Sequence, residues 1–179
     1  MLFFLSVSCF VQAQKLSLNK RVAISSLNAK AKETVGNIRV YSNGSKVTVD
    51  DASFTATEMG VKIDVVVVNA SGSKTTFTSE FNPANITYIK DHELPDKSPV
   101  GQMLISLDYK IGYNTAYHKK SGLSRSYEDE VVFNFLQVDE DNFLEIQTAL
   151  FKLRDLYTEE ENEPLKPLSK VMSRTQDFW

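Results

Sequence analysis

Apolar and polar residues alternate with a period of two through much of the middle of this chain, and this alternation restricts the fold more than any other feature. In the segment Val61–Val65 (VKIDV), the apolar side chains fall on one face of an extended strand and the charged ones on the other. The segment continues into Val66–Val68, which predicts a strand that ends buried on both faces. The pattern therefore predicts a sheet with a buried face rather than a bundle of helices.

Similar segments recur between residues 38 and 136, separated by Asn, Gly, Ser and Pro residues that favour turns. The other candidate strands are Ile38–Tyr41, Lys46–Val49, Ser53–Thr57, Thr75–Phe81, Ile86–Ile89, Met103–Tyr109 and Glu130–Leu136. Residues 110–126 are polar, and we expect a long hairpin loop there with at most one ragged strand. Six to eight short strands joined by turns predict an antiparallel meander, not alternating β and α elements.

An amphipathic helix is predicted over about residues 140–158, directly after the last strand. Asp139 or Asp141 suits its N-cap, and acidic residues favour the positive end of a helix. The apolar residues recur at steps of three and four, as one buried stripe requires: Phe143, Ile146, Leu150, Leu153 and Tyr157. Residues 159–179 form a polar tail after this helix.

The first 13 residues, MLFFLSVSCFVQA, are uncharged and largely apolar, and they end in a V-x-A pattern that signal peptidases accept. We expect residues 1–13 to be a signal peptide and the protein to be exported to the periplasm or the extracellular space. Cleavage removes Cys9, the only cysteine, and a cysteine-free mature chain is typical of a bacterial exported protein. No other stretch has the roughly 18 consecutive apolar residues of a membrane span, so we expect no transmembrane segment after cleavage.

Residues 14–36 are basic, with five Lys or Arg residues against one Glu, and their apolar residues are spaced for one short helix. We interpret this segment as a solvated leader to a single β-rich domain over residues 37–158. The alternative is a basic arm that binds an anionic surface.

A series of β-hairpins that ends in residues 131–135 (VVFNF) and passes at once into one amphipathic helix resembles the pleckstrin-homology-like fold. The resemblance covers roughly residues 45–158. It implies an α+β, mainly β chain in which an antiparallel bent sheet or open barrel is closed by one C-terminal helix. Members that bind phosphoinositides have several basic residues around the first hairpin, whereas the turn Asn69–Lys74 offers only Lys74. They also have a Trp in the closing helix, but the sole Trp here is Trp179, so the resemblance extends to the scaffold and not to headgroup binding.

The chain has few of the residue patterns that catalysis, metal binding or nucleic-acid binding requires. A net charge of −3 argues against a nucleic-acid binder, which needs a clustered cationic face. His92 and His118 are the only histidines, and no zinc-ligand spacing, nucleophile elbow or phosphate-binding glycine loop is present. We therefore expect no catalytic residue, no metal and no cofactor.

These features favour an exported, non-enzymatic domain that binds an unknown protein partner or envelope component. Two alternatives stay open: a carrier of a small apolar ligand in the mouth of a β-barrel, and an enzyme that uses scattered carboxylates.

The polar stretch at 110–126 and the residue after it mix aromatic and basic side chains, which suits recognition of a partner. The candidate residues are Tyr113, Tyr117, Lys119, Lys120, Arg125 and Tyr127. The alternative for the same stretch is a solvated hairpin whose lysines keep an edge strand soluble.

Overall fold

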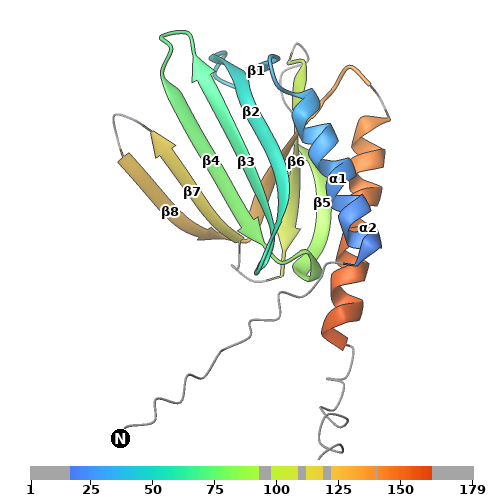
Figure 1. The fold of residues 1–179 in the computed structure, drawn as a ribbon. Helices are drawn as coiled ribbons and strands as arrows, with labels where there is room; N and C mark the ends of the chain where they lie inside the picture. The colour runs from blue at the N-terminus through green and yellow to red at the C-terminus, as the bar shows by residue number, and fades with distance from the viewer. Residues whose placement is uncertain (1–16, 93–97, 109–111, 119–121, 140, 163–179) are drawn as a thin grey trace, which may run out of the picture.

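The computed structural model describes residues 17–92, 98–108, 112–118, 122–139 and 141–162 (Figure 1). Within these residues, nine strands form two antiparallel sheets, and two helices pack beside them. The prediction of a mainly β, α+β chain is therefore confirmed. In the same residues no strand of one sheet pairs with a strand of the other, so the sheets do not close into a barrel. The expected signal peptide and residues 163–179 of the tail lie outside the described residues.

The large sheet has the strand order β1-β2-β3-β4-β7-β8. Its strands are β1 (Ile38–Val40), β2 (Lys46–Thr57), β3 (Gly60–Asn69), β4 (Lys74–Phe81), β7 (Gly112–His118) and β8 (Gly122–Glu128). The expectation of a loop over residues 110–126 is corrected, because β7 and β8 are two paired strands of this sheet. Polar residues form strands here because β4 supplies a pairing edge, and that edge is distant in the sequence.

Strand β3 alternates to its end, which corrects the prediction of burial on both faces. Val65 and Val67 are buried, whereas Val66 and Val68 are partly exposed. The reason is that the partly exposed residues share the outer face with Lys62 and Asp64, which form a solvent-accessible ion pair with an Nζ–Oδ2 distance of 2.7 Å. The face opposite the core therefore faces solvent rather than a second layer.

The small sheet has the order β5-β6-β9, with β6 in the centre. Its strands are β5 (Ile86–His92), β6 (Val100–Leu107) and β9 (Glu130–Leu136), and the single turn η1 (Pro83–Asn85) leads into β5 from the large sheet. After β6 the chain returns to the large sheet for β7 and β8, and only then enters β9. The strands therefore do not form the simple meander that the sequence predicts, because the chain changes sheet after β4, after β6 and after β8.

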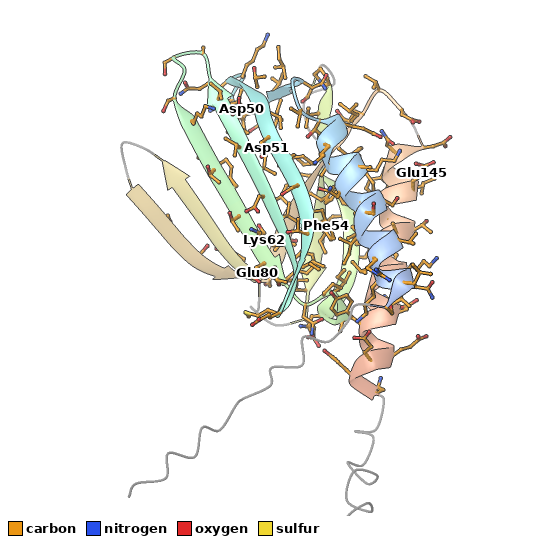
Figure 2. All side chains as sticks on the ribbon, in the orientation of Figure 1. Asp50, Asp51, Phe54, Lys62, Glu80 and Glu145 are labelled. Atoms are coloured by element: carbon orange, nitrogen blue, oxygen red, sulfur yellow. The ribbon has the colours of Figure 1, made fainter. Side chains whose placement is uncertain are left out.

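The two faces of the small sheet differ in polarity. On one face, Met103 pairs with Phe133 and Ile105 pairs with Val131, and all four side chains are buried. On the other face, Gln102 pairs with Asn134. Phe54 of β2 lies against the apolar face, with 5.9 Å between its ring centroid and that of Phe133 (Figure 2).

Helices α1 (Leu18–Glu33) and α2 (Asn142–Asn162) lie side by side and antiparallel (Figure 1). Ile146, Leu150 and Leu153 of α2 are fully buried, as predicted, whereas Phe143 and Tyr157 of the predicted stripe are partly buried and pack against the core. The helix extends four residues beyond the predicted end at residue 158 because Glu160 and Glu161 find partners there. These partners are Lys20 and Asn82, at oxygen–nitrogen distances of 2.5 and 2.7 Å.

The interpretation of residues 14–36 as a solvated leader is corrected, because α1 is part of the core. Ala23, Leu27 and Ala31 are buried at a spacing of four residues and form one face of the helix. Small side chains at two of these positions allow the helix to approach β2 closely, and Asn28 accepts a hydrogen bond from the backbone N–H of Phe54 at 3.0 Å. The basic residues on the other faces obscured this narrow apolar stripe.

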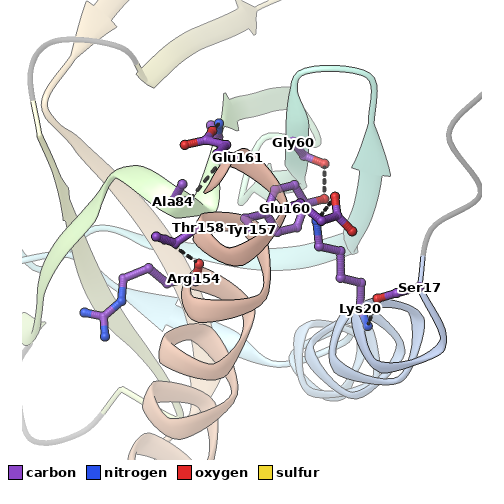
Figure 3. Close-up of polar contacts among 10 residues, drawn as sticks. Ser17, Lys20, Gly60, Ala84, Arg154, Tyr157, Thr158, Glu160 and Glu161 are labelled. Atoms are coloured by element: carbon purple, nitrogen blue, oxygen red, sulfur yellow. Dashed lines mark hydrogen bonds and ion pairs between the residues drawn. The ribbon is translucent and has the colours of Figure 1, made fainter. Parts of the chain in front are cut away.

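Lys20 links the two helices at one end of the pair (Figure 3). Its side chain is only 2% exposed, and its Nζ lies 2.5 Å from Oε2 of Glu160 and 3.5 Å from the ring centroid of Tyr157. The Tyr157 hydroxyl donates to the carbonyl of Gly60 at 3.0 Å, which ties the β2–β3 turn to the same cluster. A buried ammonium is therefore balanced by one carboxylate and one aromatic face.

Truncation of the buried stripe should destabilise the fold strongly. We expect Leu150→Ala to lower the free energy of unfolding by about 2–5 kcal/mol, because it leaves a cavity in a closely packed core. Lys152→Ala, on the exposed face of the same helix, should change it by less than about 0.5 kcal/mol. Urea denaturation measures both variants, and equal losses would contradict the assignment of the buried face.

The Lys20–Glu160 ion pair should contribute more to the free energy of unfolding than the Lys30–Glu145 ion pair at the other end of the helices. A double-mutant cycle with Lys20→Met and Glu160→Gln should give a coupling of about 1–2 kcal/mol, because the ammonium is desolvated. The matched control pairs Lys30 with Glu145, whose side chains are 21% and 58% exposed, and should give less than about 0.5 kcal/mol. Equal couplings would show that burial of Lys20 adds nothing.

Candidate functional site

A cavity of about 310 Å³ lies between the two sheets, and its size is at the lower end of the range for small-molecule sites. Strands β1, β3, β4 and β8 of the large sheet and strands β6 and β9 of the small sheet provide its walls. Four apolar side chains form one part of the lining: Ile63, Val65, Phe77 and Val132. The cavity therefore has an apolar interior of the kind that accepts the body of a small ligand.

Strand alternation and register explain why these residues meet. Val65 pairs with Phe77 and Ile63 pairs with Ser79, so β3 and β4 present these side chains on the same inward face. Ser124 and Ser126 extend the lining onto β8, the edge strand of the large sheet. The lining thus changes from apolar on β3 to small and polar on β8.

A chain of three polar side chains crosses from the large sheet to the small one in the same cavity. Arg39 on β1 donates from Nη2 to Oε1 of Gln102 on β6 at 2.9 Å. Gln102 donates in turn from Nε2 to Oδ1 of Asn134 on β9 at 3.2 Å. Gln102 and Asn134 are each only 5% exposed. These two amides therefore fix one another and hold one edge of the guanidinium.

Arg39 has a charge that the described residues do not balance. No carboxylate in the described ranges lies within 4.0 Å of its guanidinium, and its Nε is buried without a hydrogen-bond acceptor. Burial lowers the pKa of Arg39 below its ordinary value, but an arginine still keeps its proton at neutral pH. One face of the guanidinium is covered by the ring of Tyr41, with 4.4 Å from Cζ to the ring centroid. The site thus has an uncompensated positive charge beside an apolar wall.

Four of the six residues that the sequence predicted as a partner-binding loop lie on strands β7 and β8: Tyr113, Tyr117, Arg125 and Tyr127. In the backbone ladder, Tyr113 pairs with Tyr127, Tyr117 with Leu123, and Thr115 with Arg125. Lys119 and Lys120 lie outside the described residues. Partner binding by this hairpin stays a prediction, and its second strand is also the edge from which Ser124 and Ser126 line the cavity.

Arg39, Gln102 and Asn134 were not among the residues predicted from the sequence. A signal was present for two of them, because Gln102 lies in the apolar strand VGQMLISL and Asn134 in EVVFNFL. A buried polar residue in an apolar strand requires a hydrogen-bond partner and therefore points to a polar network. Arg39 gave no such signal, since only the paired sheets bring it near Gln102.

His92 is not one of the residues that line the cavity. His92 is the last residue of β5, and His118 is the last residue of β7. In the described part of the chain, no three His, Cys, Asp or Glu residues are grouped so that they could hold a metal ion. Neither described helix combines the length and the apolar character that crossing a membrane requires.

Comparison of the chain with protein-family models, with curated proteins and with the solved structures gave no match. Its function is therefore inferred from the cavity and its lining.

If Arg39 serves binding rather than folding, its removal should not destabilise the empty protein. We expect Arg39→Met to leave the free energy of unfolding within about 1 kcal/mol of wild type, because the removal of a partly desolvated charge and an unpaired N–H offsets the loss of the hydrogen bond to Gln102. Chemical denaturation of the two proteins measures this difference. A loss of more than about 2 kcal/mol would identify Arg39 as a structural residue.

Proposed function

We propose that this protein is a non-enzymatic binding protein that holds a small ligand with an apolar body between its two sheets. The observation that supports the proposal best is the cavity of about 310 Å³, with apolar side chains on β3, β4 and β9 and hydrogen-bonding groups on β1, β6, β8 and β9. Ligand sites typically combine a mostly apolar lining with a few placed polar groups. The proposal corresponds to the carrier that the sequence left open as an alternative.

The chemistry of the lining supports binding over catalysis. The described polar residues of the cavity are Arg, Asn, Gln, Ser, Thr and Tyr, and none of the described lining residues is His, Cys, Asp, Glu or Lys. The absent types are the usual general acids, general bases and nucleophiles at neutral pH. The serines have no such base among the lining residues that could activate them. An enzyme that uses scattered carboxylates is therefore the less favoured function.

Two finer predictions also remain proposals. Export to the periplasm or the extracellular space rests on residues 1–13. A pleckstrin-homology-like scaffold rests on the passage from β9 directly into α2. The six-stranded large sheet and the buried α1 are features that the resemblance did not include.

A neutral fluorescent dye tests ligand binding without any assumption about charge. We expect N-phenylnaphthylamine to bind the full chain with enhanced fluorescence, and octanol to displace it. Ser79→Trp should abolish this binding, because the indole fills the cavity from β4. Thr76→Trp adds the same ring on β4 at a position that does not line the cavity, and should bind like wild type.

Circular dichroism establishes that both variants are folded before their dye binding is compared. A folded wild-type protein that does not bind the dye would contradict the proposed function. Equal dye binding by the two tryptophan variants would place the binding site elsewhere.

A further inference from the structure

We propose that the ligand of this cavity has a single negative charge, a carboxylate attached to an apolar body, and that Arg39 binds the carboxylate. This inference rests on the proposed function and adds the chemical class of the ligand.

The first argument is the unbalanced charge of Arg39. Arg39 is partly buried, and an arginine that is withdrawn from water is normally paired with a carboxylate, because desolvation of an unpaired cation is costly. Here the only described hydrogen-bond acceptor of the guanidinium is the neutral amide of Gln102, and the buried Nε has no acceptor at all. A buried donor without a partner requires an explanation, and an anion bound in the adjoining cavity supplies one.

The second argument concerns the number of charges. Arg39 is the one cationic residue among the described residues that line the cavity. One guanidinium balances one negative charge, so a dianion would leave a second charge buried in an apolar site. The hydroxyls of Ser79, Ser124 and Ser126 are neutral donors and do not add positive charge.

The third argument concerns geometry. A guanidinium has five N–H donors in a planar fork, which matches the two oxygens of a carboxylate. The amide of Gln102 occupies only one of these donors at 2.9 Å, and its own bond to Asn134 holds it in place. The guanidinium also lies over the ring of Tyr41, with 4.4 Å from Cζ to the ring centroid. Gln102, Asn134 and Tyr41 are therefore positioning residues, and Arg39 is the residue that contacts the ligand.

The fourth argument is the position of Arg39 relative to the apolar wall. Ile63, Val65 and Phe77 line the same cavity as the guanidinium. A ligand that satisfies both features has a charged end and an apolar end, like a medium-chain fatty acid or an aryl-alkanoic acid. A free inorganic anion would leave the apolar wall exposed to water.

Octanoate and octanol form a matched pair that isolates the charged group. We expect octanoate to displace N-phenylnaphthylamine from the wild-type chain at a concentration at least tenfold lower than octanol does, because hydrogen bonds to a charged group are the stronger ones. In Arg39→Met this preference should disappear while displacement by octanol is retained. Arg154→Met removes an arginine on α2 outside the cavity and should keep the full preference.

A second variant tests the same inference without removing the arginine. Gln102→Glu keeps the shape of the side chain and places a carboxylate beside Arg39, so it should occupy the anion position from within the protein. We expect this variant to lose the preference for octanoate. Gln147→Glu makes the same exchange on α2, away from the cavity, and should keep the preference.

The outcomes separate the two proposals. If the dye does not bind the wild-type chain, the proposed function fails. If the dye binds and both alcohol and acid displace it equally, the cavity is a binding site but the inference of an anionic ligand is wrong. If Arg39→Met keeps the preference for octanoate, another residue binds the carboxylate.

Discussion

The register between β6 and β9 determines both the core and the cavity. Because side chains alternate across a strand, pairing Met103 with Phe133 also pairs Gln102 with Asn134 on the opposite face. The apolar face is buried with the helices in one core, and the polar face contributes two amides to the cavity. A slip of one residue in β9 would place the Asn134 amide in the core and the rings of Phe133 and Phe135 in the cavity. The core and the candidate site are therefore specified by the same strand pairing.

The local sequence pattern predicted those strands and helices in which buried and exposed side chains alternate regularly. Strand β9 has the bounds that alternation predicted, Glu130–Leu136, and the stripe Ile146, Leu150 and Leu153 is buried as expected. The predicted strands Lys46–Val49 and Ser53–Thr57 are parts of one strand, β2. A bulge between Val49 and Asp51 interrupts the alternation of side chains, but the pairing with β3 continues past it. For elements with one regularly buried face, the period of the apolar residues was sufficient to predict which residues are buried.

The features that could not be predicted from the sequence depend on contacts between residues that are far apart in the chain. The strand β7 depends on an edge offered by β4, some 35 residues earlier in the chain, as the pairing of Thr78 with Thr115 shows. The narrow apolar stripe of helix α1 is buried only because β2 and α2 pack against it. The cavity required both sheets, because Arg39 and Gln102 belong to different ones. None of these contacts produces a period in the local sequence.

The antiparallel helix pair has a mechanical consequence. Lys20 meets Glu160 at one end of the pair, and Lys30 meets Glu145 at the other, so the first turns of α1 lie beside the last turns of α2. A load applied between these two adjacent turns acts across the helix interface rather than along it. The contacts between α1 and α2 then separate one after another, beginning with Lys20 and Glu160. Tension that pulls β2 and β3 in opposite directions along their length would instead load the backbone hydrogen bonds of the whole ladder together, so we expect the helix pair to separate at a lower force.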